Sequence, residues 1–177
     1  MLAAQTAAVF ELDQRAVLAA AGLRTPALTA IMKTVTFFGT KNFLFPATAL
    51  VTVLLFWQKR RHRLVFPLTM LAAWFVMEGL KLLTARPRPD FCPLLPETGF
   101  SFPSGHAFMG MLFFGFLAIL LPPVQRAGKR AIILFIILLG FSRLYLGVHY
   151  PTDILAGWAG GLFFLGLLAG RRPGNKN

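Results

Sequence analysis

Residues 64–85 read LVFPLTMLAAWFVMEGLKLLTA, and their only ionisable side chains are Glu78 and Lys81. Because a helix rises about 1.5 Å per residue, this segment is long enough to cross the roughly 30 Å hydrocarbon core of a bilayer. Four other stretches are similarly apolar, namely residues 37–57, 104–121, 131–147 and 152–169. These stretches predict an all-α integral membrane protein, a bundle of five transmembrane helices. Whether the chain has a sixth transmembrane helix is left open.

The composition supports a membrane protein over a soluble one. Of the 177 residues, 56% are hydrophobic and only 14% are charged, whereas soluble domains carry about 25% charged residues. The single cysteine excludes a disulfide scaffold, and the apolar content excludes a disordered chain. The length predicts one domain, residues 1–177.

The N-terminal residues 1–26 have a different pattern from the apolar stretches. Apolar Phe10, Leu12 and Leu18 are interspersed with Glu11, Asp13, Gln14 and Arg15. This mixture is too polar to cross a bilayer and predicts an amphipathic helix lying at the membrane interface. Residues 26–39 predict a second short helix, which is either interfacial or a bent entry into the first span.

The basic residues divide into two groups along the chain. The protein has 18 Lys and Arg against six Asp and Glu, a formal charge of +12. Ten of the basic residues fall on one side of the predicted spans, without an acidic residue among them: Lys59, Arg60, Arg61, Arg63, Arg126, Lys129, Arg130, Arg171, Arg172 and Lys176. Positively charged loops remain in the cytoplasm. We therefore expect a cytoplasmic C-terminus, an extracytoplasmic N-terminus and an extracytoplasmic loop at residues 86–103.

This division also bears on possible partners. A strongly basic protein often binds nucleic acid, but here the ten cations are split over three short segments beside lipid. Nucleic-acid binding is therefore disfavoured, and the lipid bilayer is the expected partner.

Polar residues gather at the predicted extracytoplasmic ends of the spans. Ionisable groups at membrane depth are costly and therefore indicate function. Several basic groups converging there predict a site for a multiply charged anion, for which phosphate fits best. Backbone N–H groups at a helix start near Ser104-Gly105-His106 would bind such an anion. Two histidines and an aspartate could supply a nucleophile, a proton donor and an orienting carboxylate.

Lys81 and Arg86, two basic residues near this site, have additional interpretations. Glu78 and Lys81 lie three residues apart on one helix face, so they are expected to pair. Arg86 is either a phosphate contact or a solvated loop charge.

Three sequence motifs carry a resemblance to a known family. The chain resembles the type 2 phosphatidic acid phosphatase (PAP2) superfamily in the complete, ordered motifs Lys81-x6-Arg88-Pro89, Pro103-Ser104-Gly105-His106 and Ser142-Arg143-x5-His149-x3-Asp153. The motifs extend over residues 81–153. The family usually has six spans, and the expected first span is replaced here by the N-terminal interfacial segment.

The resemblance implies a role for each matched residue. His149 would be the nucleophile that forms a phosphohistidine, Asp153 would hold and polarise it, and His106 would be the general acid. The phosphate would be bound by Lys81, Arg88, Ser104, Gly105 and Arg143. The resemblance also implies that no metal or other cofactor takes part.

The implied activity is hydrolysis of a membrane lipid phosphate. Relatives act on phosphatidic acid, phosphatidylglycerol phosphate, undecaprenyl diphosphate or lipid A phosphate, and the motifs do not choose among them. The short loops and basic edges are typical of the bacterial inner (cytoplasmic) membrane. Two alternatives stay open, a lipid phosphotransferase using the same intermediate and a non-catalytic membrane scaffold, and the oligomeric state is undetermined.

Overall fold

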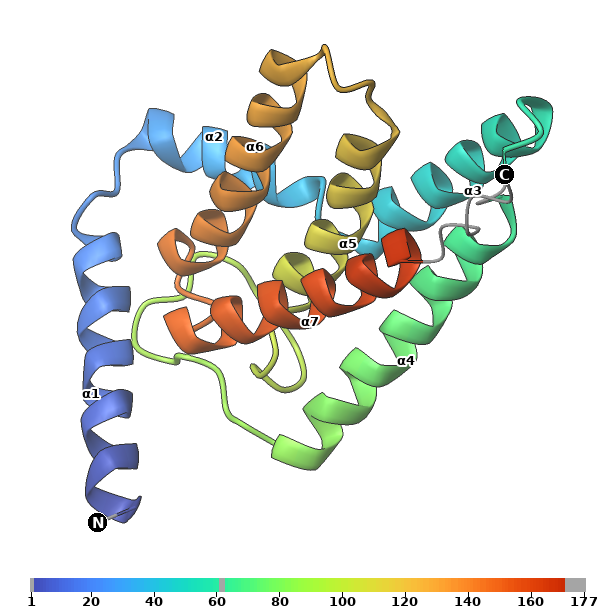
Figure 1. Ribbon diagram of the computed structural model, residues 1–177. Helices are drawn as coiled ribbons and strands as arrows, with labels where there is room; N and C mark the ends of the chain where they lie inside the picture. Colours follow the sequence, from blue (N-terminus) through green and yellow to red (C-terminus); the bar gives the residue numbers. More distant parts are fainter. Residues whose placement is uncertain (1, 61–62, 171–177) are drawn as a thin grey trace.

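The computed structural model describes residues 2–60 and 63–170, and this part of the chain is helical without a strand. Its helices are α1 (Leu2–Ala21), α2 (Pro26–Phe37), α3 (Lys41–Trp57), α4 (Val65–Thr84), α5 (Gly105–Leu120), α6 (Arg126–Tyr145) and α7 (Pro151–Gly170). In Figure 1, α5 and α7 cross at the centre, α1 runs along one side, and α4 forms the opposite side. The long connection between α4 and α5 folds back beneath α6 and α7.

The helices lie close to the predicted stretches, with two differences. The first span is predicted at residues 37–57, whereas α3 begins only at Lys41, after the short helix predicted at residues 26–39. The structure has the helix α2 there, which meets α3 at an angle of 46° across a short break. The helix α6 begins at Arg126, before the predicted start at residue 131. The basic residues ahead of the apolar segment are therefore also helical.

Only some of the helices are both long enough and apolar enough to cross a membrane by themselves. Among residues 2–60 and 63–170, α4 and α7 are long and apolar enough, and the bent α2–α3 pair passes if it counts as one span. The helix α5 is apolar but has 16 residues. Five or six spans therefore remain a prediction. The predicted cytoplasmic residues Arg61, Arg171, Arg172 and Lys176 lie outside the described part of the chain.

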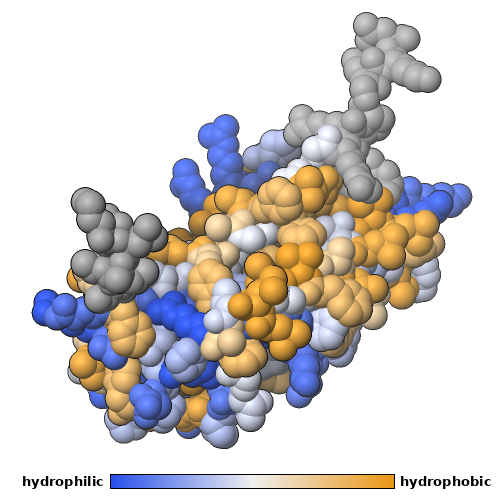
Figure 2. All heavy atoms as spheres, turned by 90° about the horizontal axis from the view of Figure 1, so that it is seen from below, coloured by the Kyte–Doolittle hydropathy of each residue, from blue (hydrophilic) through white to orange (hydrophobic). Residues whose placement is uncertain are grey.

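Large apolar side chains cover much of the outer surface. Leu68 and Phe75 on α4, Leu134 on α6 and Phe163 on α7 are all exposed. Figure 2 shows broad hydrophobic areas on the face seen from below, with hydrophilic groups gathered mainly toward one end. Such continuous apolar surface is typical of helices that contact lipid.

The centre of the fold is a close contact between α5 and α7. Small residues let helix backbones approach in membrane proteins, and α7 presents Gly157, Gly160 and Gly161 to α5. A Cβ atom added at Gly157 would lie 2.7 Å from the carbonyl oxygen of Ser104. The buried Phe108 of α5 fills the space over the other two glycines.

The α5–α7 contact makes a testable prediction about stability. In Gly161→Ala the new methyl group would come within 3.0 Å of the Phe108 carbonyl oxygen, so the two helices must separate. We expect a loss of about 1–3 kcal/mol in the free energy of unfolding. Gly166→Ala is the matched control, since nothing lies within 4 Å of its added Cβ. Thermal unfolding in detergent measures both, and equal midpoints would contradict the close contact.

Candidate active site

The ends of four helices meet at one cavity. Its volume is about 630 Å³, and six of the residues predicted for the site line it: Lys81, Arg88, Gly105, His106, Arg143 and His149. They come from the last turns of α4 and α6, the first turn of α5, and the connections on either side of those helices. The structure therefore brings together residues separated by up to 68 positions in the sequence.

His149 and Asp153 form a buried pair at one wall of the cavity. The Nδ1 atom of His149 lies 3.5 Å from Oδ2 of Asp153 and 3.3 Å from Oγ of Ser101. Ser101 donates its only hydroxyl proton to Oδ2 of Asp153, 2.5 Å away. Since this proton is committed to Asp153, the contact with His149 requires Nδ1 to carry the hydrogen and donate it.

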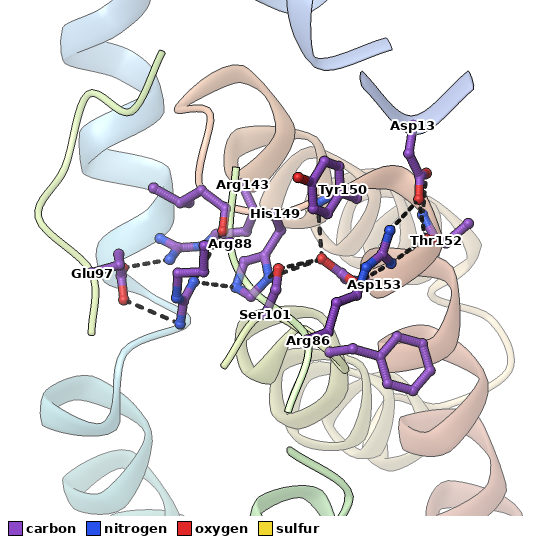
Figure 3. Close-up of polar contacts among 12 residues, drawn as sticks. Asp13, Arg86, Arg88, Glu97, Ser101, Arg143, His149, Tyr150, Thr152 and Asp153 are labelled. Carbon is purple, nitrogen blue, oxygen red and sulfur yellow. Dashed lines mark hydrogen bonds and ion pairs between the residues drawn. The ribbon is translucent and has the colours of Figure 1, made fainter. Parts of the chain in front are cut away.

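The other ring nitrogen of His149 faces a cation. Nη1 of Arg88 donates to Nε2 of His149 at 3.1 Å, and Figure 3 shows this contact on the side of the ring opposite Ser101 and Asp153. An arginine has no lone pair to offer, so Nε2 must be the unprotonated nitrogen. The two sets of contacts thus select the same tautomer, in which the lone pair of Nε2, on the cavity side, accepts the hydrogen bond from Arg88.

The surroundings of His149 also favour its neutral form. The side chain is 1% exposed. Burial is the main influence that lowers the pKa of His149 to about 4, and the cations Arg143 and Arg88 act in the same direction. The Asp153 carboxylate opposes them without reversing the shift. At neutral pH the ring is therefore uncharged and nucleophilic.

Asp153 is held as a carboxylate by several donors. Besides Ser101, the backbone N–H of Tyr150 donates to its Oδ2 at 2.9 Å, and Nη1 of Arg86 donates to its Oδ1 at 2.7 Å. Asp153 is fully buried, and an ionised buried carboxylate needs such partners. The side chain thus has a fixed orientation behind His149.

Arg88 and Arg143 are joined by an acidic residue that sequence reasoning did not select. The Glu97 carboxylate forms a short ion pair with Nη2 of Arg143 and lies 3.8 Å from Nη2 of Arg88. Burial opposes ionisation of Glu97, but Arg143 and Arg88 outweigh it and hold the pKa of Glu97 below its usual value. Arg143 also donates to Oγ1 of Thr36 at 2.7 Å.

Several buried polar atoms at or beside the cavity have no partner among the described residues. In the part of the chain that the structure describes, Oγ of Ser104, Nε2 of His106 and Nε of Arg143 have no hydrogen-bond partner. Buried polar groups are normally paired, so three such atoms around one cavity point to a polar ligand. The His106 ring packs over Gly39, where an added Cβ would lie 2.5 Å from its Cδ2 atom.

Not every predicted site residue lines the cavity in the same way. Asp153 lies behind His149, and Ser104 is buried beside the cavity. Lys81 reaches the cavity and pairs with Oε1 of Glu78 at 3.3 Å, as expected for residues three positions apart. Arg86 matches neither earlier interpretation, because it binds two buried carboxylates, those of Asp13 and Asp153.

Sequence reasoning missed three residues of the site, which lie outside the three motifs: Asp13, Glu97 and Ser101. It selected Arg86, in a variable position of the first motif, but for a different role. The acidic residues carried one signal, since each is an ionisable residue on the predicted extracytoplasmic side. Nothing in the local sequence indicates the partner of each, because the contacts join distant segments.

The cavity has an apolar side as well. Five apolar residues also line it: Leu44 and Phe45 of α3, and Met70, Trp74 and Met77 of α4. An apolar channel leading to a basic, hydrogen-bonding end suits an amphipathic ligand with an anionic head.

These features define a class, the helical membrane proteins with a basic cavity where helix ends meet. Comparison with known proteins is more specific. The family model of the PAP2 superfamily matches residues 63–175. The chain is 34% identical to phosphatidylglycerophosphatase B of Bacillus subtilis over 176 residues, which are 95% of this chain and 87% of that protein. It is 38% identical over 95 residues to lipid A 1-phosphatase of Rhizobium johnstonii, covering 48% of this chain and 37% of the relative.

A solved structure has the same fold. The crystal structure of a transmembrane PAP2 type phosphatidylglycerolphosphate phosphatase from Bacillus subtilis matches with a TM-score of 0.85 at 32% identity. The match covers 92% of this chain and 85% of that one. The chain belongs to the PAP2 superfamily.

The state of His149 can be tested directly. The chain has three histidines, so nitrogen NMR of protein labelled with ¹⁵N-histidine in detergent gives a simple spectrum, and His149→Asn assigns the signal. Since burial lowers its pKa to about 4, His149 should stay neutral, with hydrogen on Nδ1, from pH 8 down to about pH 5. Titration near pH 6.5, or hydrogen on Nε2, would contradict the geometry.

Proposed function

We propose that this protein is a metal-independent phosphatase that hydrolyses a membrane lipid phosphate through a phosphohistidine intermediate on His149. One observation carries the proposal: Nε2 of His149 is unprotonated and meets Arg88 at a cavity that Arg143 and Lys81 also line. Before the attack, Arg88 transfers its hydrogen bond from Nε2 to a phosphate oxygen, which frees the lone pair. A neutral nucleophile among cations is suited to attack a phosphoryl group, whose negative charge the cations neutralise.

The first step transfers the phosphoryl group to the enzyme. Nε2 of His149 forms a bond to phosphorus while the bond from phosphorus to the lipid oxygen breaks. His106 donates a proton to that leaving oxygen, and Asp153 stabilises the positive charge that develops on the His149 ring. Arg88, Arg143 and Lys81 bind the equatorial oxygens of the phosphoryl group.

The second step regenerates the enzyme. Water attacks the phosphorus of the phosphohistidine, His106 accepts a proton from it, and the bond to Nε2 breaks to release inorganic phosphate. The unpaired Oγ of Ser104 and the N–H groups at the start of α5 supply hydrogen bonds to the phosphate in both steps.

A metal has no role in this scheme. The three side chains assigned to chemistry are His149, His106 and Asp153, and the groups around them are cations. Divalent metal sites use several oxygen, nitrogen or sulfur ligands free of such cations. The charge stabilisation that a metal would give is assigned here to Arg88, Arg143 and Lys81.

We further propose that the chain is one domain with five spans, namely α3 with the bend that precedes it, α4, α5, α6 and α7. The N-terminus of α3, the C-termini of α4 and α6, and the N-termini of α5 and α7 all lie near the cavity. This alternation is what successive spans require when the site is on one membrane face. The basic residues at the opposite helix ends support a cytoplasmic location for those ends, in a bacterial inner membrane.

The lipid class follows from the two parts of the cavity. The basic end suits a phosphate headgroup, and the apolar side between α3 and α4 suits acyl or prenyl chains arriving from the bilayer. Phosphatidylglycerol phosphate is the first candidate, since the relative matched over 95% of this chain is a phosphatidylglycerophosphatase. Phosphatidic acid, undecaprenyl diphosphate and lipid A phosphate are the other arms of the test.

The test is phosphate release by purified protein from each of these four lipids in detergent micelles, compared as kcat/KM. His149→Ala should lose at least about 1000-fold in kcat, and Cys92→Ala should keep wild-type rates because its thiol has no part in the reaction. Wild-type phosphate release by His149→Ala would reject the nucleophile. Consumption of lipid without release of phosphate into water would identify a phosphotransferase instead.

A second prediction concerns Glu97, whose carboxylate is paired with the two arginines assigned to phosphate. A substrate phosphate must displace this carboxylate, so Glu97→Gln should strengthen competitive inhibition by inorganic phosphate. The expected change is roughly tenfold, equivalent to about 1.4 kcal/mol. Glu11→Gln removes an exposed carboxylate away from the cavity and should leave inhibition unchanged. Weaker inhibition in Glu97→Gln would mean that Glu97 holds the arginines in place for phosphate.

A further inference from the structure

The N-terminal helix contributes a buried acid to the region behind His149. Most of the large apolar residues of α1 are exposed, among them Leu12 and Leu18, but Asp13 is only 2% exposed. Figure 3 shows Asp13 beside Thr152 and Arg86, on the side of Asp153 away from His149. A buried carboxylate requires a specific partner.

Both oxygens of Asp13 are used. Oδ1 accepts a hydrogen bond from the backbone N–H of Thr152 at 3.1 Å, and Oδ2 accepts from Oγ1 of Thr152 at 2.5 Å. The Thr152 N–H belongs to the first turn of α7, where backbone donors lack partners within the helix. Asp13 therefore caps α7 from another helix, and a carboxylate is also favourable at that positive helix end.

Arg86 connects Asp13 to Asp153. Its Nη2 donates to Oδ2 of Asp13 at 2.7 Å, and its Nη1 donates to Oδ1 of Asp153 at 2.7 Å. The guanidinium group also lies over the ring of Tyr150, 4.4 Å from its centroid. Both terminal nitrogens are thus committed to carboxylates, and Arg86 is not among the residues that line the cavity.

We propose that Asp13 and Arg86 are positioning residues for the reaction: Asp13 of α1 holds Arg86, and Arg86 holds the Asp153 carboxylate in the orientation that supports Nδ1 of His149. This relay makes α1 a part of the catalytic apparatus. The proposal rests on the function proposed for His149 and deepens it. Among the described residues, the Asp153 carboxylate has four protein groups around it, namely Arg86, Ser101, the Tyr150 N–H and the neutral His149 ring, and of these Arg86 alone is charged.

The test compares Asp13→Asn, Arg86→Gln and the double variant with Glu11→Gln. Glu11 is a matched control because it is a carboxylate on the same helix, 62% exposed and paired with Arg15. We expect kcat to fall about 10- to 100-fold in each single variant, in the range found for groups that orient a reactive side chain, with KM changed less than twofold. The double variant should be no worse than about threefold below Arg86→Gln, because the residues act as one unit.

Two further readouts separate positioning from a loss of structure. Arg86→Lys and Asp13→Glu should recover part of the lost kcat, since they restore the charges. In ¹⁵N-histidine NMR, the His149 signal should lose some of its Nδ1–H form in Asp13→Asn and Arg86→Gln and keep it in Glu11→Gln. This measurement does not depend on activity, so it tests the relay even if no lipid is hydrolysed.

The outcomes distinguish the relay from the function on which it rests. Full activity of His149→Ala would reject the proposed function alone. An inactive His149→Ala together with wild-type kcat in Asp13→Asn and Arg86→Gln would overturn the relay, as would an unchanged His149 tautomer in both variants. A raised KM with unchanged kcat in Arg86→Gln would also overturn it, because Arg86 would then bind the phosphate.

Discussion

Helices α5 and α7 approach so closely that the backbone N–H of Ser104 donates a hydrogen bond to the carbonyl oxygen of Asp153, 3.0 Å away. This contact exists because α7 carries glycines where α5 crosses it. It joins the start of one helix to the first turn of the other, so His106 and His149 face the same cavity. A side chain at Gly157 would push α5 away from α7 and so separate the two histidines.

The loop at residues 85–104 depends on that frame and completes the site. Two backbone hydrogen bonds hold it in place. Near the ends of the loop, the Ser101 N–H donates to the Arg86 carbonyl oxygen at 2.8 Å. In its middle, the Leu94 N–H donates to the Leu146 carbonyl oxygen at 2.9 Å. The loop therefore brings Arg88 to Nε2 of the His149 ring and Ser101 to Nδ1. Because those two contacts require opposite protonation at the two ring nitrogens, the loop determines the tautomer as well as the position of His149.

The helical architecture and the cavity-lining motif residues were within reach of sequence reasoning, for physical reasons. Apolar length predicts helices in a membrane protein, and the motif residues are chemically distinctive against an apolar background. The break before α3 was harder, since its residues fit either a bend or a separate helix. Asp13, Ser101 and Glu97 could not be assigned because their roles depend on partners up to 139 residues away, and Arg86 because its contact with Asp153 crosses 67 residues.

The charges around the site form two sets that differ in what can replace them. Glu97 is partly exposed in the cavity and pairs with both Arg88 and Arg143. In the proposed reaction, an incoming phosphate meets the same two arginines and exchanges with the Glu97 carboxylate. Asp13 and Asp153 are buried with Arg86 between them, and an anion in the cavity does not reach that guanidinium. When phosphate takes the place of Glu97 on the two arginines, the charge on the cavity side of His149 changes. The charge on the Asp153 side of the ring stays constant. If His149 is the nucleophile, as proposed, its ring gains positive charge during attack. The separation then keeps the Asp153 carboxylate beside the ring and away from Arg88 and Arg143.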